Sequence, residues 1–254
     1  NTIACIEKAD VILITGSNTT ENHPVLSSFV KRAVTQKGAK LIVVDPRRIK
    51  ITRYADIWLR QNLGTDVAWL NGLMHVIIQE NLYVKSFVEN RTVGFDDVRK
   101  IVEKFTPEYV EEITGIPAGD IVDAARLYAG AKRGSILYCM GITQHTTGTD
   151  NVKSLANLAM LCGNLGIEGG GVNPLRGQNN VQGACDMGSL PDFLPGYQSL
   201  SDALASKSFE ETWGISIPTN TGLTALEMIE QVKAGKIKGM LIVGDNPVSN
   251  FPCP

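Results

Sequence analysis

The sequence predicts an α/β protein with a Rossmann-like, mostly parallel sheet and helices on both faces, followed by part of a second α/β domain. Four short apolar runs lack the alternation of half-exposed strands, which is typical of parallel strands covered on both sides. Segments with helical periodicity lie between these runs. Each run ends in a polar loop, and ligands of such sheets bind beyond the carboxyl ends of the strands.

The first strand–helix–strand unit occupies the N-terminal fifth of the chain. "ADVILITGSN" predicts a buried strand that ends at Gly16. In the helix that follows, Pro24 suits the first turn and Gly38 is placed to end it. "AKLIVVDPRR" predicts the second buried strand. This order and spacing indicate a right-handed βαβ unit.

The remaining elements are assigned in the same way. The sequence predicts a helix over 66–81 with Asp66 at or near its N-cap, a helix-rich stretch from Tyr83 to Lys132, a buried strand at "GSILYCMG", a long helix at "TDNVKSLANLAMLCGNLG", an amphipathic helix at "TALEMIEQVKAGK" and a last buried strand at "IKGMLIVGDNP".

Composition narrows the function classes. The 254 residues are 43% hydrophobic, and a net charge of -2 gives no electrostatic reason to expect a nucleic acid or an anionic membrane as partner. No apolar run reaches the ~18 residues that cross a bilayer, so direct membrane insertion is not expected. The chain begins "NTIACIEKAD" without Met and ends "NFPCP", which predicts a section of a larger protein.

The five cysteines show no metal-binding spacing and no CxxC pair. Their odd number prevents complete pairing into disulfides. Cys139 and Cys162 lie in apolar runs and are expected to be buried thiols.

The strand-end loops suit a purine nucleotide. The sequence lacks GxGxxG after a strand, GK[ST], GxSxG and HExxH, which removes the commonest alternatives. Asp45 could accept from ribose hydroxyls, Asp66 from the N1 and N2 donors of guanine, and the amides of Gly16, Ser17 and Gly64 could face phosphates. Taken singly, each residue is better explained by a structural role, Asp66 as a helix cap and Asp45 as a turn former.

The run "NPLRGQNNVQGACDMG", residues 173–188, is either a solvated linker or the wall of a polar site. A single Arg in such a run is usually a surface residue or half of a salt bridge. Arg176, however, precedes Gly177, which allows close approach of the backbone, and the amide-bearing Gln178. Its guanidinium could bind a small carboxylate with two hydrogen bonds. The three histidines have exposed or structural explanations, and none is assigned to catalysis.

A family resemblance connects these features. Residues 140–188, from "MGITQHTTG" to "GACDMG", resemble the molybdopterin oxidoreductases. "RGQNNVQGACDMG" followed by "PDFLPGY" resembles the version found in the catalytic subunits of formate dehydrogenases. The segments "GSNTTENHP", "VVDPRR", "LGTD" and "GDNP" match in the same order, so the resemblance spans essentially the whole chain.

The resemblance implies a molybdenum or tungsten ion held by two molybdopterin guanine dinucleotides, each gripped by an α/β domain. It places a boundary near Arg176, with one cofactor-binding domain over 1–175 and part of a second over 176–254, and Arg176 orienting formate. The other residues that it implies are Gly16, Asn18, Glu21, Asp45, Arg47, Gly64 and Asp66 around one guanosine and its phosphates, Met140, Gly141, Gln144, Gly177 and Gln178 on the pterin side, and Asp245 and Asn246 at the second nucleotide.

The family's other parts are not in this sequence. The cysteines of its [4Fe-4S] cluster, the selenocysteine or cysteine that ligates the metal, the adjacent histidine and the C-terminal cap are expected before residue 1 and after residue 254. We therefore expect the middle of a formate dehydrogenase catalytic subunit, inactive alone, that passes electrons to an iron–sulfur subunit or domain. A nitrate reductase-like enzyme and a non-catalytic scaffold, such as the large iron–sulfur subunit of respiratory NADH dehydrogenase, are the alternatives.

Overall fold

The computed structural model describes residues 2–250 and divides the chain into two units, Asn1–Gly177 and Gln178–Pro254. The units are described separately below. Within residues 2–250, no helix combines the length and the apolar character that crossing a bilayer requires.

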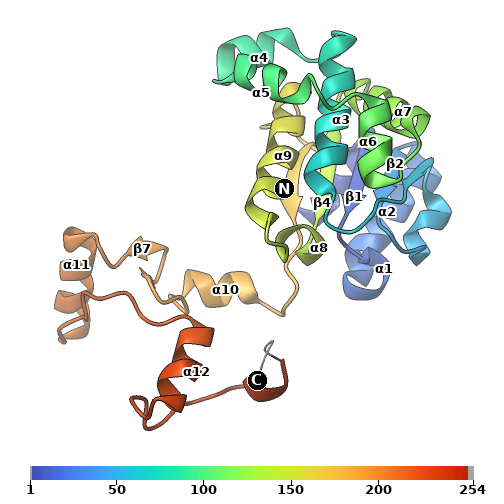
Figure 1. The fold of residues 1–254 in the computed structure, drawn as a ribbon. Helices are drawn as coiled ribbons and strands as arrows, with labels where there is room; N and C mark the ends of the chain where they lie inside the picture. The colour runs from blue at the N-terminus through green and yellow to red at the C-terminus, as the bar shows by residue number, and fades with distance from the viewer. Residues whose placement is uncertain (1, 251–254) are drawn as a thin grey trace. The chain divides into compact units, whose positions relative to one another are not determined.

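A five-stranded, fully parallel sheet organises the first unit, which confirms the predicted fold class (Figure 1). The strand order is β3-β2-β1-β4-β5. In register, Leu13 of the central strand lies between Ile42 and Ile136. The chain moves from β1 to one side of the sheet and then returns to place β4 on the other side, so the order reverses between β1 and β4. The strands are β1 Val11–Thr15, β2 Lys40–Val44, β3 Ile57–Leu59, β4 Gly134–Tyr138 and β5 Gly171–Pro174.

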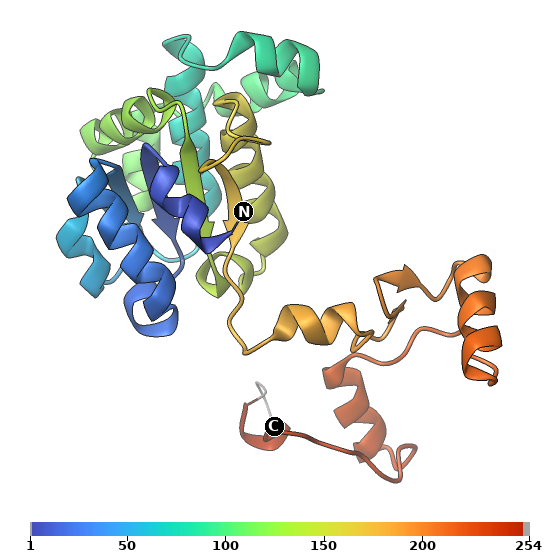
Figure 2. The ribbon, with the colours of Figure 1, turned by 180° about the vertical axis from the view of Figure 1, so that it is seen from behind.

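Helices cover both faces of this sheet. Figure 1 views it from the side of α3 and α9, and Figure 2 from the side of η1 and α2. The helices of the first unit are η1 Ile3–Lys8, α1 Thr19–Asn22, α2 Pro24–Lys37, η2 Lys50–Tyr54, α3 Asp66–Gln79, α4 Lys85–Arg91, α5 Phe95–Val102, α6 Pro107–Thr114, α7 Ala118–Ala129, α8 Met140–Thr143 and α9 Gly148–Leu161.

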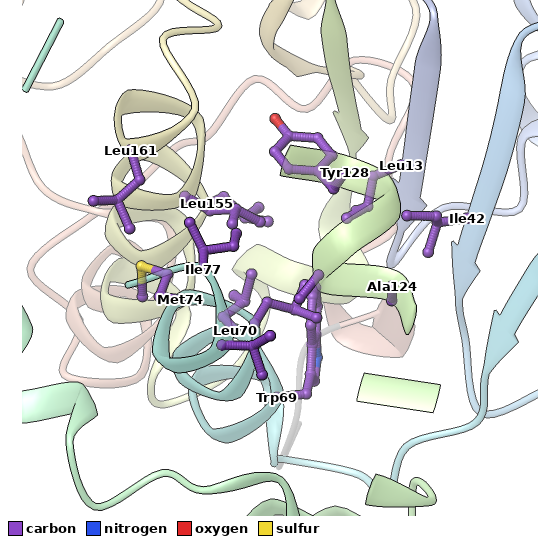
Figure 3. Packing of buried hydrophobic residues seen from close by; sticks show 14 of the residues in the cluster. Leu13, Ile42, Trp69, Leu70, Met74, Ile77, Ala124, Tyr128, Leu155 and Leu161 are labelled. Atoms are coloured by element: carbon purple, nitrogen blue, oxygen red, sulfur yellow. The ribbon is translucent and has the colours of Figure 1, made fainter. Parts of the chain in front are cut away.

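Successive strand residues point to opposite faces, so the sheet separates two apolar cores. Leu13 packs in the larger core with Trp69 and Leu70 of α3 (Figure 3). Ile12 and its neighbours on the other face pack against Val30 of α2. All of these side chains are fully buried, as the continuous apolar runs predict.

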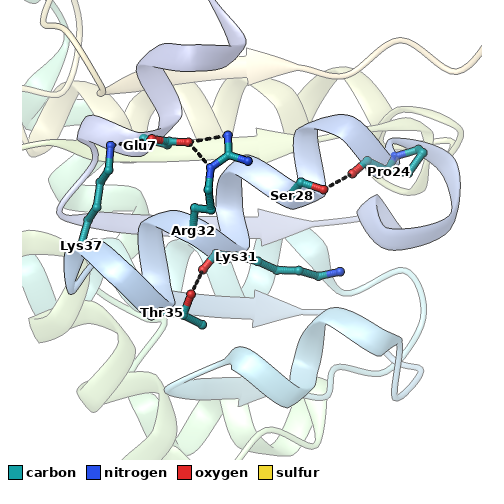
Figure 4. Close-up of polar contacts among 7 residues, drawn as sticks. All are labelled: Glu7, Pro24, Ser28, Lys31, Arg32, Thr35 and Lys37. Carbon is teal, nitrogen blue, oxygen red and sulfur yellow. Dashed lines mark hydrogen bonds and ion pairs between the residues drawn. The ribbon is translucent and has the colours of Figure 1, made fainter.

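The ends of α2 are set as the sequence predicts. Pro24 occupies its first turn, and Gly38 ends it in the left-handed conformation with φ 77°. Glu7 of η1 forms ion pairs with Lys37 and Arg32, and so ties η1 to α2 (Figure 4). These two cations lower the pKa of the Glu7 carboxyl.

The second unit is built mainly of helices. They are α10 Val181–Asp186, α11 Ala203–Trp213, α12 Ala225–Lys233 and α13 Pro247–Asn250. The strands β6 Phe193–Leu194 and β7 Gln198–Ser199 pair antiparallel. The predicted helix at "TALEMIEQVKAGK" is confirmed as α12, which begins with a capping box of Thr224 and Glu227.

One predicted element of the second unit is wrong. The predicted strand at 237–247 is absent: residues 237–246 form no helix or strand, Pro247 begins α13, and Leu241 and Val243 are 90% and 82% exposed. A buried parallel strand needs hydrogen-bonded neighbours and cover on both faces. The described residues of this unit offer no parallel strand with which the segment could pair. The polar run 173–188 also contains more regular structure than expected, since it includes the end of β5 and the whole of α10.

The predicted burial of two cysteines is confirmed. Cys139 and Cys162 are buried free thiols, whereas Cys5 and Cys185 are partly exposed free thiols. Cys253 lies outside the described residues. Burial raises the pKa of the Cys162 thiol to about 12.

We predict that Cys162 of the folded chain resists alkylation at pH 8, because little thiolate forms and the residue is only 5% exposed. Cys185 should be labelled at least about tenfold faster. Iodoacetamide labelling read by peptide mass spectrometry measures both rates. In denaturant the two rates should converge, and equal rates in the folded chain would contradict the prediction.

Candidate functional site: a cleft where the strand order reverses

A cleft of about 260 Å³ lies beyond the carboxyl ends of β1, β2, β3 and β4. It is centred where the strand order reverses, which is the usual ligand position in open parallel sheets. Its lining comes from the four loops that follow these strands. The lining residues are Gly16, Ser17, Asn18, Asn22, Asp45, Pro46, Arg47, Gln61, Asn62, Leu63, Gly64, Asp66, Cys139, Met140, Gly141 and His145.

The floor of the cleft depends on two glycines in contact. Gly141 donates its backbone N–H to the carbonyl of Gly16 over 3.0 Å. A Cβ on Gly16 would lie 2.6 Å from the backbone of Gly141 and Ile142, and a Cβ on Gly141 would lie 2.6 Å from Gly16 Cα. Gly16 also has φ 57°, which favours glycine. The loops after β1 and β4 can therefore approach this closely only without side chains.

Asp45 is buried and shapes the loop after β2. Its Oδ1 accepts the backbone N–H of Arg47 over 2.8 Å, and the Arg47 Nε lies 3.7 Å away. The turn-forming role expected for Asp45 is therefore present, and the same carboxylate faces the cleft.

Asp66 is 4% exposed and begins α3. The N-cap of this helix is Thr65, and the Asp66 Oδ1 instead accepts from the indole N–H of Trp69 over 3.3 Å. Burial raises the pKa of the Asp66 carboxyl, and the indole hydrogen bond offsets this only in part. The simple capping role is thus not what holds Asp66 in place. Burying the Asp66 carboxylate costs free energy, and a ligand that donates hydrogen bonds to it would recover part of that cost.

The cleft contains polar atoms that a ligand could satisfy. Ser17 Oγ, Asn18 Oδ1 and Gln61 Oε1 are buried, and none has a hydrogen-bond partner among the residues that the structure describes. Buried polar atoms normally have partners, because leaving one unpaired costs about 1–3 kcal/mol. These atoms and Asp66 fit the hydroxyls, amines and ring N–H groups of a nucleotide.

The predicted site residues are only partly brought together. The cleft contains Gly16, Asn18, Asp45, Arg47, Gly64, Asp66, Met140 and Gly141. Glu21 of α1 and Gln144 after α8 are exposed and do not line it. Glu21 accepts from Asn18 Nδ2 over 2.9 Å and pairs with Lys50. Gln178, Asp245 and Asn246 belong to the second unit and are exposed.

Sequence reasoning missed several cleft residues. Gln61 and Asn62 follow β3, which was not predicted because it has only three residues. Asn22 lies at the end of the short helix α1, and His145 follows α8. His145 Nε2 donates to the carbonyl of Gly141 over 2.9 Å, so it supports the loop after β4. The signal that could have identified them is their position within a few residues of a strand end.

Arg176 lies on the chain that leaves the edge strand β5. Leu175 donates its N–H to the carbonyl of Tyr138 over 2.7 Å, which continues the β4–β5 pairing by one residue. Arg176 itself is exposed in this chain. The next residue, Gly177, lies against the Met140 side chain, where a Cβ would come within 2.4 Å of Met140 Cε. The described residues contain no group of three or more His, Cys, Asp or Glu placed to hold a metal ion.

Comparison with known proteins gives a consistent result. A family model described as molybdopterin oxidoreductase matches residues 1–253. The chain is 52% identical over 253 residues to the F420-dependent formate dehydrogenase subunit alpha of Methanocaldococcus jannaschii, covering 99% of this chain and 37% of that protein. It is 47% identical over 249 residues to formate dehydrogenase H of Escherichia coli, covering 98% of this chain and 35% of that protein.

A solved structure supports the fold. The acetylene hydratase of Pelobacter acetylenicus superimposes with a TM-score of 0.59 at 32% identity, covering 63% of this chain and 24% of that chain. The chain thus spans little more than a third of the length of the formate dehydrogenases that it resembles.

We predict that Gly16→Ala destabilises the first unit by about 3 kcal/mol or more, because the new Cβ meets backbone and the left-handed φ is lost. Gly38→Ala is the matched control. Gly38 also has positive φ, but a Cβ there has nothing within 4 Å, so the cost should be only about 1 kcal/mol. Denaturant unfolding measures both variants, and equal costs would contradict the close contact.

We predict that Asp66→Asn stabilises the chain at pH 7. The folded pKa of Asp66 is raised, so its contribution to stability is present below the ordinary pKa of 3.8 and is lost as pH rises through the folded value. Asn keeps an acceptor for Trp69 without the charge. The gain should therefore shrink from pH 7 towards pH 4 in thermal unfolding.

Asp150→Asn is the matched control for Asp66→Asn, since Asp150 lies in the first turn of α9 but is exposed. It should bring no gain at pH 7, because it removes a favourable charge from a helix N-terminus. A loss of stability in Asp66→Asn at pH 7 would refute the role of burial.

Proposed function

Since this chain belongs to the molybdopterin oxidoreductase family, we propose that it is the middle portion of a formate dehydrogenase catalytic subunit, which oxidises formate to CO2. The observation that carries the proposal is the identity of 47–52% with formate dehydrogenases over 98–99% of the chain. The acetylene hydratase is 32% identical over 63% of the chain. A formate enzyme is therefore favoured over another member of the fold, and the polar cleft with buried atoms that lack partners among the described residues speaks against a scaffold role.

The cleft suits the guanosine and phosphates of one molybdopterin guanine dinucleotide. The Asp66 carboxylate would accept from N1 and N2 of guanine, and Asp45 would accept from the ribose hydroxyls. Ser17 Oγ and Gln61 Oε1, which lack partners, would gain them from the same ligand. Arg47 and the amides of the glycine loops would face phosphate.

The pterin end and the second nucleotide complete the proposal. Met140, Gly141, Gln144, Gly177 and Gln178 would border the pterins, and Asp245 and Asn246 would meet the second guanosine. The first domain would cover residues 1–175 and the second would begin at Arg176. When bound, the molybdenum or tungsten cofactor supplies the two-electron redox chemistry.

Arg176 would hold the substrate. Its planar guanidinium can donate one hydrogen bond to each formate oxygen and keeps its charge at any working pH. Formate loses one proton and two electrons, HCOO⁻ → CO2 + H⁺ + 2e⁻, so fixing the carboxylate fixes the direction of the C–H bond that breaks. The electrons would leave through a [4Fe-4S] cluster and an iron–sulfur subunit or domain outside this chain. We expect this chain alone to be inactive.

We predict that Arg176→Ala in the whole enzyme lowers kcat/KM for formate by about a hundredfold or more, because the substrate loses its orienting charge. Metal and guanine nucleotide content should stay at the level of the unchanged enzyme, since Arg176 does not line the cleft. Arg176→Lys keeps the charge but not the paired donors, so its kcat/KM should lie between that of Arg176→Ala and that of the unchanged enzyme. Near-normal turnover by Arg176→Ala would refute the substrate role.

A further inference from the structure

We infer that His23 is a positioning residue for Arg176, an inference that rests on the proposed formate site. The two residues are 153 positions apart in sequence, yet His23 Nε2 lies 2.8 Å from the Arg176 carbonyl oxygen. A carbonyl oxygen can only accept, so Nε2 is the donor. Nδ1 of the same ring is buried and has no hydrogen-bond partner among the described residues. Among these residues, the bond to Arg176 is therefore the hydrogen bond that orients the imidazole ring.

This bond completes a set of contacts that hold the backbone around Arg176. The preceding amide, of Leu175, is bonded to Tyr138 at the end of β4. The following residue, Gly177, lies against the Met140 side chain. His23 holds the carbonyl between these two points. The Cα from which the guanidinium extends is thereby fixed by the first unit alone.

His23 also connects Arg176 to the cleft. It follows α1 directly and stands before Pro24, so it ends one helix and begins the next. The loop that leads into α1 supplies Ser17 and Asn18 to the cleft lining. The same short segment therefore contacts the proposed nucleotide site at one end and the backbone of the proposed formate residue at the other.

His23 is packed among apolar residues on the α2 side of the sheet. His23 and Arg176 both border a second cavity, of about 520 Å³, on the α2 side of the sheet. Its walls include the buried Leu26 and Leu137. An imidazole between α1 and α2 is thus held by packed helices, and a leucine could take its place without burying a new polar group.

The consequence for catalysis is specific. His23 bonds the Arg176 backbone and not its guanidinium, so it is not a catalytic residue. Without the His23 donor, the carbonyl of Arg176 loses this hydrogen bond, and the guanidinium is less often in the orientation that binds formate. A displacement of about 1 Å at a positioned group can cost up to about a hundredfold in rate.

The test compares His23→Leu with His23→Gln in the whole enzyme. The Gln Nε2 is a donor at about the reach of the His Nε2, whereas Leu has none. We expect His23→Leu to lower kcat/KM for formate about tenfold, mainly through KM, with metal and nucleotide content unchanged. His23→Gln should stay within about threefold of the unchanged enzyme. A purely structural role would lower the fraction of loaded enzyme, and hence kcat, and leave KM as it was.

A second readout needs no activity. Trypsin cleaves after Arg176, and the scissile carbonyl is the one that His23 holds. In this 254-residue chain, His23→Leu should speed that cleavage about fivefold, as expected for the loss of one ordinary hydrogen bond, and His23→Gln should not. Cleavage after Lys132, in the exposed loop before β4, is the internal control and should not change.

The outcomes separate this inference from the proposed function. An unchanged KM in His23→Leu, or a Gln variant as impaired as the Leu variant, would overturn the positioning role even if Arg176→Ala abolishes turnover. Retained turnover in Arg176→Ala would overturn the formate site itself. A raised KM together with faster cleavage after Arg176, both reversed by Gln, supports the inference.

Discussion

The contact between Gly16 and Gly141 is the constraint on which the site depends. It joins the loops after β1 and β4 where the strand order reverses, and it leaves no room for a Cβ on either residue. Because β1 and β4 are neighbours in the sheet, the loops that follow them start side by side. Here they touch through backbone, so the wall of the cleft is formed by main-chain groups. The polar side chains of the cleft then come from the rest of the loop after β1, which supplies Ser17 and Asn18, and from the loops after β2 and β3, which supply Asp45 and Asp66.

Several buried polar groups in the cleft lower the stability of the fold, and a bound ligand would offset this cost. Asp66 is buried with a raised pKa, and Ser17, Asn18 and Gln61 leave buried polar atoms without partners among the described residues. The first unit has an apolar core on each face of the sheet, and Figure 3 shows part of the larger one. Buried polar atoms without a partner among the described residues also occur outside the cleft, for example at Tyr128 and Asn151. Three of them, however, belong to residues that line the same concave region as the buried Asp66 carboxylate, a grouping expected of a binding site.

Much of the first unit is predictable because local and global signals agree there. The uniform apolar runs of β1, β2 and β4 indicate strands that are covered on both faces. The ends of α2 are set by Pro24 in its first turn and by Gly38 after its last, and both effects depend only on the local sequence. β3 and β5 were not predicted because three or four residues are too few to show a hydrophobic pattern that identifies a strand. The strand expected over 237–247 is absent because its apolar sequence favours burial, whereas the described residues of the second unit provide no neighbouring parallel strand. In the site, strand-end position indicated Asp45 and Asp66, whereas the bond from His23 to Arg176 joins residues that no sequence spacing relates.

The most direct measurement is the nucleotide content of the whole protein with and without the Asp66 carboxylate. The account predicts that the unchanged protein releases guanine nucleotide on unfolding and that Asp66→Asn releases clearly less, although its fold is at least as stable. Full retention of guanine nucleotide in Asp66→Asn, or release of adenine nucleotide in place of guanine, would contradict it.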